Sequence, residues 1–229
     1  MFKKCLPLLG ALVLASPTYA VTVNMSDFTY GAPADVAMTG TPAYDGSAGQ
    51  FTGALTDGSA SSDSLRFGAT DAASTTSFVA WCAELTQNFR FHLDYDYTMV
   101  TGVAHFGAPK TTNLSRLFTA AQGFVVNSDT SAAMQAGIWE IIYETGQTFD
   151  LGGGTFHGTA DTVAGQLAFD AMDLFLNNLG FYSASATIDV LENGERQDFL
   201  IGTVPEPETW ALFAAGLGVI ALLRRRRKA

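Results

Sequence analysis

Positively charged residues are scarce in the interior of this sequence. Between Val21 and Glu208 there are five Lys or Arg residues against twenty-two Asp or Glu residues, so 5 − 22 leaves a net charge of −17 over that stretch. Binding to nucleic-acid phosphates depends on clustered Lys and Arg, and a surface this acidic also repels anionic lipid. The composition therefore excludes a nucleic-acid-binding protein.

Recognisable enzyme signatures are also missing. No serine lies in a nucleophile-elbow motif, and no pair of carboxylates has a spacing that supports acid–base catalysis. His92, His105 and His157 do not have the spacing of zinc ligands, and no EF-hand loop follows Asp94 and Asp96. We therefore expect no enzyme, no metal and no cofactor, and we interpret the two aspartates as solvated carboxylates.

Long hydrophobic runs occur only at the two ends of the chain. At the front, Lys3 and Lys4 precede the apolar run Leu6–Ala15, which is too short to span a bilayer permanently, and Thr18-Tyr19-Ala20 provides small residues three and one before a cut. We interpret residues 1–20 as a signal peptide, with a signal helix, that signal peptidase removes. The alternative is a buried N-terminal core helix, which would carry both lysines in its first turn.

The other end of the chain has three parts in a fixed order. The motif Val204-Pro205-Glu206-Pro207 is followed by an uncharged run over residues 210–223, and then by the basic cluster Arg224, Arg225, Arg226, Arg227 and Lys228. A helix over residues 210–223 rises roughly 21 Å, which is short for a hydrocarbon core of about 30 Å, so we expect a marginal transmembrane helix. The cations hold that end in the cytoplasm.

This tail, residues 204–229, closely resembles the PEP-CTERM sorting signal of Gram-negative bacteria. The resemblance implies that an exosortase, a membrane cysteine protease-transpeptidase, processes the chain near Pro-Glu-Pro. We therefore expect the protein in the inner membrane in transit, and then in the cell envelope, on the cell surface or in the extracellular matrix. The alternative is an ordinary single-pass anchor with a proline-rich linker, which leaves the localisation much the same.

The interior, residues 21–203, has a common length for one acidic extracytoplasmic globular domain. Its first part, residues 21–77, is rich in Gly, Ala, Ser, Thr and Asp, which suits short strands and long turns. Residues 78–91 are dense in aromatics, and residues 95–100 predict a strand.

Helical patterns begin after that strand. The three predicted helices cover residues 113–121, 132–143 and 161–178, with Asn113 capping the first and Ser128 or Asp129 capping the second. Asn193-Gly194 then predicts a hairpin between residues 183–191 and 197–204. We therefore predict an α+β fold: a mostly antiparallel β domain with about three inserted helices, plus the signal helix and the short transmembrane helix at the ends.

Cys82 is the one cysteine that stays in the mature domain, because Cys5 leaves with the signal peptide. Exported proteins usually pair their cysteines or lack them, so a lone thiol needs a reason. Three reasons are open: an inert buried thiol, an intermolecular disulfide, or a covalent partner other than cysteine.

A glutamine in the second predicted helix is a candidate for that partner. Gln135, Ile138 and Trp139 share one helical face, since neighbours on a face are three and four residues apart. If Cys82 packs against this face, its thiolate can attack the Gln135 carboxamide and expel ammonia, which leaves an intramolecular thioester. Such a bond forms only if the thiol and the carboxamide are held next to each other and protected from water. We expect the side chains of Trp81, Ile138 and Trp139 to shield it.

The two segments resemble the Cys-Gln thioester domains of bacterial surface adhesins. Trp81-Cys82 matches the family's aromatic-Cys element, and Gln135-Ala136-Gly137-Ile138-Trp139 matches its Gln element, with glycine at the family's alanine position. The resemblance covers about residues 78–199 and implies that the bond acylates amines on a target surface. An amine-bearing surface or an exopolysaccharide is then the expected partner.

Two other functions stay open at this point. Cysteine is among the most buried residue types, so the protein can be a structural matrix component with an inert thiol and a hydrogen-bonded Gln135. It can also be a polysaccharide-binding module, for which Tyr30, Tyr44 and Phe51 are the candidate aromatics. Amine adducts at Gln135 separate the first hypothesis from these two.

Overall fold

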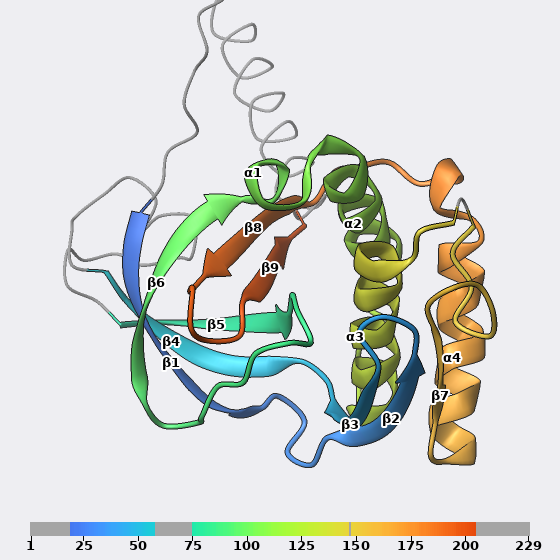
Figure 1. The fold of residues 1–229 in the computed structure, drawn as a ribbon, viewed down its shortest axis with the longest axis horizontal. Helices are drawn as coiled ribbons and strands as arrows, with labels where there is room; N and C mark the ends of the chain where they lie inside the picture. The colour runs from blue at the N-terminus through green and yellow to red at the C-terminus, as the bar shows by residue number, and fades with distance from the viewer. Residues whose placement is uncertain (1–18, 58–74, 147, 205–229) are drawn as a thin grey trace, which may run out of the picture.

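The computed structural model describes residues 19–57, 75–146 and 148–204. A strand-rich half and a helix-rich half lie side by side in this part of the chain, as Figure 1 shows. The expected signal peptide, apart from Tyr19 and Ala20, and the expected transmembrane helix with its basic cluster lie outside the described residues. Among the described residues, no helix is both long enough and apolar enough to cross a membrane.

Six antiparallel strands form a closed barrel in the order β1-β4-β5-β9-β8-β6. Their bounds are β1 Tyr19–Phe28, β4 Phe51–Asp57, β5 Thr75–Cys82, β6 Asp94–Thr101, β8 Thr187–Glu192 and β9 Phe199–Thr203. The barrel closes where β1 pairs with β6, with Val21 opposite Tyr97. Alternate residues of β1, namely Val21, Val23 and Met25, are buried, as expected for a strand with one face in the core.

A small second sheet has the antiparallel order β3-β2-β7. Its strands are β2 Ala34–Thr39, β3 Tyr44–Ala48 and β7 His157–Ala160. Both β2 and β3 pack against α3, so this sheet covers one side of that helix. The apolar residues Val36 and Met38 of β2 are buried there.

Four α-helices and one 3₁₀ turn make up the helical half. They are α1 Gly102–Phe106, α2 Ala108–Ala120, α3 Ser128–Tyr143, α4 Val163–Leu176 and the turn η2 Leu179–Phe181. Helix α3 is the central one, because it lies between α2, α4 and the small sheet, and every residue from Ser131 to Ile142 is buried. Asn127 and Thr130 form a capping box at its start.

The predicted α+β class with mostly antiparallel strands is confirmed, and details of the helices differ. The part of the chain that the structure describes has four α-helices rather than about three, because α1 has only five residues and leaves no periodic pattern to recognise. Helix α2 begins at Ala108 with a proline in its first turn, so Asn113 lies inside the helix and does not cap it. Helix α3 is capped by Asn127 rather than by Ser128 or Asp129.

Candidate functional site

Cys82 is the last residue of β5, where that strand passes from the barrel toward the helical half. It pairs with Phe199 of β9, and Ala83 continues the ladder by donating its backbone N–H to the Asp198 carbonyl oxygen at 2.9 Å. The residue is 6% exposed, and its sulfur is a free thiol. The strand pairing therefore fixes the backbone on both sides of the thiol.

Gln135 lies about one turn into the buried part of α3 and faces Cys82 directly. Its side-chain Oε1 accepts a hydrogen bond from the Cys82 backbone N–H at 2.8 Å, and its Nε2 donates to the Cys82 carbonyl oxygen at 2.9 Å. Gln135 is fully buried. The carboxamide therefore makes the two backbone hydrogen bonds that a neighbouring strand would otherwise make with Cys82. It holds the two residues together although 53 positions separate them in sequence.

The surroundings of the thiol keep it protonated. Burial raises the pKa of Cys82, and the negative charge of Glu84 raises it further. Among the described residues no Lys, Arg or His is a cause of this shift, so no positive charge assists formation of the thiolate. Any reactivity of Cys82 must therefore come from its position beside Gln135 rather than from an activated thiolate.

The three residues expected to shield the pair are all buried, but they point in different directions. Ile138 and Trp139 lie on the same face of α3 as Gln135, and the Trp139 ring lies 5.0 Å from the Tyr44 ring. Trp81 precedes Cys82 in the strand and packs instead against Phe118 of α2, at a ring distance of 6.4 Å. Shielding of the Gln135 side therefore comes from α3 and from β3.

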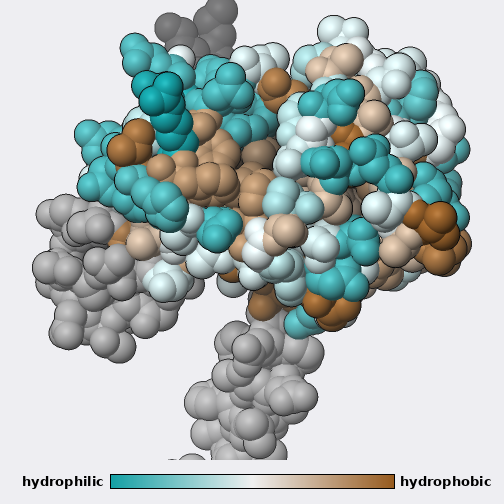
Figure 2. Space-filling model, turned by 90° about the horizontal axis from the view of Figure 1, so that it is seen from below, coloured by the Kyte–Doolittle hydropathy of each residue, from teal (hydrophilic) through white to brown (hydrophobic). Residues whose placement is uncertain are grey.

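A cavity of about 210 Å³ reaches Cys82 and is bordered by the end of β1, the start of β4 and the segment after β5. In Figure 1 the end of β1 lies at the lower side of the barrel. Its lining residues are Phe28, Tyr44, Ser47, Phe51, Cys82, Leu85, Gln87, Asn88, Phe89, Phe91 and Gln197. Gln135 does not line it, so Cys82 is the member of the pair that faces the cavity. Figure 2 shows this lower face, with hydrophobic side chains gathered on the barrel side among hydrophilic ones.

The cavity wall consists of aromatic rings and neutral polar groups. Phe51 lies at the centre of the aromatic part, with ring centroids 4.7 Å from Phe28 and 5.2 Å from Phe89. The Gln87 side-chain oxygen is buried and accepts no hydrogen bond from a described residue. Among the described residues, no Lys, Arg or His lines the cavity. A ligand that donates hydrogen bonds therefore suits this site better than one that only accepts them.

Most of these lining residues did not stand out in the sequence. Residues 85–91 belong to the aromatic-dense stretch that follows Trp81, and this density was the one available signal. Gln197 had no recognisable signal in the sequence. Its Nε2 donates to the Glu84 carbonyl oxygen at 2.8 Å and holds the segment after Cys82 in place. Of the three aromatic candidates for polysaccharide binding, Tyr44 and Phe51 line the cavity, whereas Tyr30 lies elsewhere and donates to the Val125 carbonyl oxygen.

Comparison with known proteins identifies the tail of the chain. Residues 203–228 match the PEP-CTERM protein-sorting motif. This match supports an exported protein that an exosortase processes, and it implies transit through the membrane to the cell envelope. No curated protein matches the chain, and no solved structure matches it.

The sorting motif follows the barrel almost immediately. Val204 is the last described residue, and β9, which lies between β5 and β8 in the barrel, ends one residue earlier at Thr203. Pro205, Glu206, Pro207 and the basic cluster lie outside the described residues. The last strand of the described fold therefore ends at the first residue of the matched segment.

A second buried polar cluster lies at the other end of α3. Glu140 is fully buried; its Oε1 accepts from the Asp150 N–H at 2.9 Å, and its Oε2 has no hydrogen-bond partner among the described residues. Burial raises the pKa of Glu140 to about 8, with smaller contributions from the charges of Glu144, Asp173 and Asp150, while the Asp150 N–H opposes the shift. Glu140 therefore carries its proton at neutral pH.

Glu144, one turn later, is held in the opposite state. Burial alone would raise its pKa, but the Thr155 hydroxyl and the backbone N–H groups of Phe156, Gly146 and Thr155 donate to its carboxylate and lower the pKa to about 2. An added Cβ at Gly154 would lie 2.5 Å from a Glu144 oxygen, which explains the glycine there. This carboxylate organises the loop after α3.

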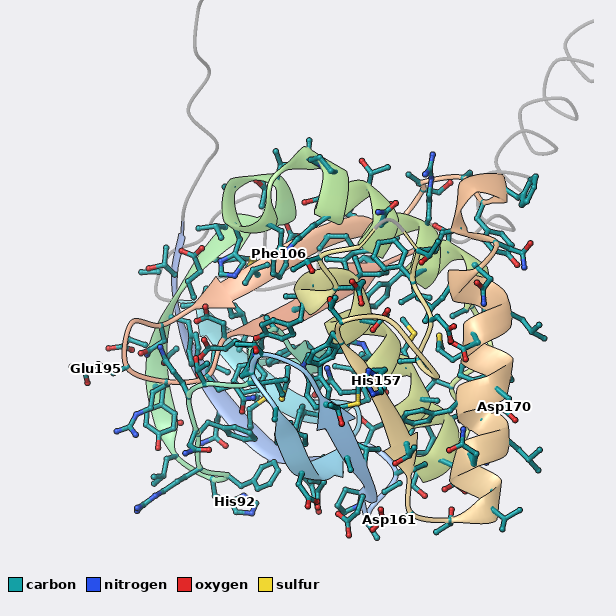
Figure 3. All side chains as sticks on the ribbon, turned by 45° about the vertical axis from the view of Figure 1, so that its right-hand side comes forward. His92, Phe106, His157, Asp161, Asp170 and Glu195 are labelled. Carbon is teal, nitrogen blue, oxygen red and sulfur yellow. The ribbon has the colours of Figure 1, made fainter. Side chains whose placement is uncertain are left out.

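The remaining sequence candidates are dispersed over the surface. Asp94 and Asp96 accept from Asn24 and Thr22 across the β1–β6 pair, in exposed positions. His105 contacts Glu192 at 2.5 Å, whereas His92 lies at the lower edge of the molecule in Figure 3. Within the described ranges no group of three or more His, Cys, Asp or Glu side chains is arranged to hold a metal ion.

Proposed function

We propose that this exported protein is a non-enzymatic surface or matrix adhesin in which Cys82 Sγ and Gln135 Cδ form an internal thioester that captures one amine. The observation that carries the proposal is the pair of reciprocal hydrogen bonds between the Gln135 carboxamide and the Cys82 backbone. Export and exosortase processing, which the sorting motif supports, deliver such a protein to a place where it meets foreign surfaces.

The bond-forming step is an acyl transfer that needs no further reactant. The Cys82 sulfur attacks Gln135 Cδ, a C–S bond forms, the C–N bond of the carboxamide breaks, and the thiol proton leaves with the amino group as ammonia. Because the pKa of the thiol is raised, the thiolate is scarce and proximity must supply the driving force. Two buried hydrogen bonds fix the Gln135 carboxamide against the Cys82 backbone, which supports the proximity that this step requires.

The hydrogen bonds around the carboxamide also suit this step. The Cys82 N–H donates to Oε1, the oxygen on which negative charge develops when sulfur adds to Cδ, so it acts as an oxyanion donor. The hydrogen bond from Nε2 to the Cys82 carbonyl oxygen is lost with the ammonia, while the one to Oε1 persists in the thioester. The product therefore keeps one of the two contacts that hold α3 against β5.

The cavity provides access for the amine. A primary amine that enters it attacks Gln135 Cδ from the Cys82 side, the new C–N bond replaces the C–S bond, and the proton of the amine returns to sulfur. The Gln87 oxygen offers an acceptor for that amine, and the absence of Lys, Arg and His from the wall avoids repulsion of its cationic form. Because the thioester is consumed, each molecule reacts once and the protein is not an enzyme.

Intact-mass measurement of the exported, unreduced chain tests the proposal. We expect a mass lower than that of the mature sequence by one ammonia, and this deficit disappears in Cys82→Ala and in Gln135→Glu. Methylamine should add at Gln135 in the wild-type chain and release a thiol that reacts with a maleimide. A full mass together with no methylamine adduct would refute the thioester and leave Cys82 an inert buried thiol.

A second candidate function uses the same cavity without covalent chemistry. Tyr44 and Phe51 lie in its wall together with the carboxamides of Gln87, Asn88 and Gln197, a combination of aromatic and amide groups that suits a sugar ring. In that case polysaccharide binding weakens in Tyr44→Ala and stays unchanged in Cys82→Ala. Binding that is lost in Cys82→Ala and unchanged in Tyr44→Ala favours the thioester instead.

A further inference from the structure

Stretches of different lengths without an acidic residue interrupt the strongly acidic interior. Residues 97–128, 174–188 and 199–205 contain neither Asp nor Glu, in an interior whose net charge is 5 − 22 = −17. The first of them is 32 residues long, whereas the interior averages about one acidic residue in nine positions. Their arrangement in space therefore decides whether the protein has a surface that differs electrostatically from the rest.

The three stretches come together on one side of the molecule. The Ser115 hydroxyl of α2 donates to the Ala186 carbonyl oxygen at 2.6 Å, and the Thr119 hydroxyl accepts from the Ala186 N–H at 3.1 Å. Gly202 of β9 lies directly against the Phe118 ring, since an added Cβ would lie 2.2 Å from it. Figure 1 shows α1, the start of α2, the connection from α4 to β8 and the end of β9 along the upper edge.

We call this side the upper face and define it by α1, the first turn of α2, residues 179–187 and the end of β9. Two large apolar side chains project from it, namely Val103, which is 54% exposed, and Phe181, which is 88% exposed. In Figure 3, Phe106 of α1 lies near the upper edge, whereas the acidic residues Asp161, Asp170 and Glu195 lie on other sides. Of the carboxylates bordering this face, Glu192 is paired with His105.

The tail leaves the domain at the upper face. Strand β9 ends at Thr203, and the apolar run of the sorting segment begins at Trp210. Residues 205–209 between them span at most about 18 Å when fully extended. While the sorting segment is in the membrane, the upper face is thus held close to the bilayer surface.

We infer that the upper face rests on the surface of an anionic phospholipid bilayer while the tail is uncut. The acidic sides are repelled by the anionic lipid headgroups, the upper face is not, and Val103 and Phe181 can insert among the headgroups. Because residues 205–209 are a short connection, the upper face is the face of the domain nearest to the bilayer. In this orientation the cavity at Cys82, on the lower side, points away from the membrane toward the surroundings.

Labels at matched exposed positions test the orientation. The exported chain with its tail uncut is reconstituted in vesicles of phosphatidylethanolamine and phosphatidylglycerol, in a Cys82→Ala background, with a fluorophore on Val103→Cys, Phe181→Cys or Val163→Cys. Val163 is 82% exposed at the opposite end of α4 and is the control. We expect nitroxide-labelled lipid to quench the labels at positions 103 and 181 several-fold more than the label at position 163.

Charge substitutions test the same contact without a change of label. In a chain labelled at position 104, Phe181→Asp with Val103→Asp should strongly reduce the quenching, whereas Val163→Asp with Leu167→Asp should not; all four positions are exposed, so the fold is retained. Equal quenching at positions 163 and 181, or none at 103 and 181, overturns the inference. Quenching that depends on protein density without nitroxide lipid indicates a second copy as the occupant and also overturns it. Neither outcome bears on the thioester, because the background lacks Cys82.

Discussion

The two halves of helix α3 both bury polar side chains, but they satisfy them differently. In the first half, both polar groups of the Gln135 carboxamide are paired with the backbone of one strand residue, Cys82. In the second half, Glu140 has one buried oxygen without a partner among the described residues, while Glu144, the C-cap residue directly after the helix, accepts four hydrogen bonds from the following loop.

The difference separates a fixed contact from two titratable ones. A carboxamide cannot ionise, so the Gln135–Cys82 contact is insensitive to pH. Such a contact suits a site whose two residues must keep a constant relative position. Glu140 and Glu144 make the same helix sensitive to pH in opposite directions, because burial favours the neutral form of one and hydrogen bonds favour the charged form of the other. We therefore expect the second half of α3 to set the pH dependence of stability.

The largest expected effect is that of Glu140→Gln at alkaline pH. The folded pKa of about 8 lies above the unfolded value of 4.5, so the contribution is fully present below pH 4.5 and is lost as the pH rises through 8. The full loss is roughly 5 kcal/mol, at about 1.36 kcal/mol for each unit of pKa difference. Gln keeps an acceptor for the Asp150 N–H and cannot ionise, so urea unfolding at pH 9 should show the variant to be more stable than wild type.

The control for this variant is a titration of stability in both chains. Glu144 contributes stability that is present above pH 4.5 and is lost as the pH falls through about 2, so both chains should weaken equally in acid. If the wild-type chain shows no greater loss of stability than Glu140→Gln between pH 5 and 9, Glu140 is not a buried neutral carboxyl and the comparison fails.

In the first half of the helix, Gln135→Leu should cost about 3 kcal/mol, independent of pH. The substitution leaves the Cys82 N–H and carbonyl oxygen buried without partners, at roughly 1–3 kcal/mol each. The measurement belongs in a Cys82→Ala background, where the backbone groups remain and no thioester can form. A cost below that of a typical surface substitution, or a cost that varies between pH 5 and 9, would show that this contact is not the fixed one.

The Gln135 face could be predicted from sequence, and its environment could not. Helical periodicity alone places Gln135, Ile138 and Trp139 on one buried face of α3. The end of β5 reaches that face only because β5 pairs with β4 and β9, and the β9 pairing joins Cys82 to Phe199, far away in the chain. Pairings of that kind leave no local signal, so the contact stayed a hypothesis until the structure placed it.

Glu140 illustrates the other limit. A glutamate in an amphipathic helix normally faces solvent, and nothing in the sequence marks this one as buried under residues 150–151. Helix α4 shows the same effect: apolar residues three and four apart in its sequence include Leu167, which is nevertheless 64% exposed, while Gly165 and Phe169 are buried. Periodicity indicates that a face exists, and tertiary packing decides how far round the helix it extends.

A smaller effect is expected at the start of α3. Asn127→Ala removes the side-chain oxygen that accepts from the Thr130 N–H at 2.9 Å, and a lost N-cap costs about 1 kcal/mol. Urea unfolding should show this cost at every pH, because the cap, like the Gln135 contact in the same half of the helix, contains no titratable group. Asn127→Ser keeps an acceptor and is the matched control, so a loss of similar size in both variants would contradict the role of the cap.

The smallest net effect is expected at Gly137, between the two halves. An added Cβ would meet the flexible Met172 side chain, with Sδ at 2.9 Å, so the crowding cost of roughly 1 kcal/mol nearly offsets a helix-propensity gain of similar size. Gly137→Ala should therefore change the unfolding free energy little in the wild-type chain. In a Met172→Ala background the crowding is gone, and the same substitution should stabilise the protein by close to the full propensity gain. If Gly137→Ala has the same effect in both backgrounds, Met172 does not restrict this position, and packing does not explain the glycine.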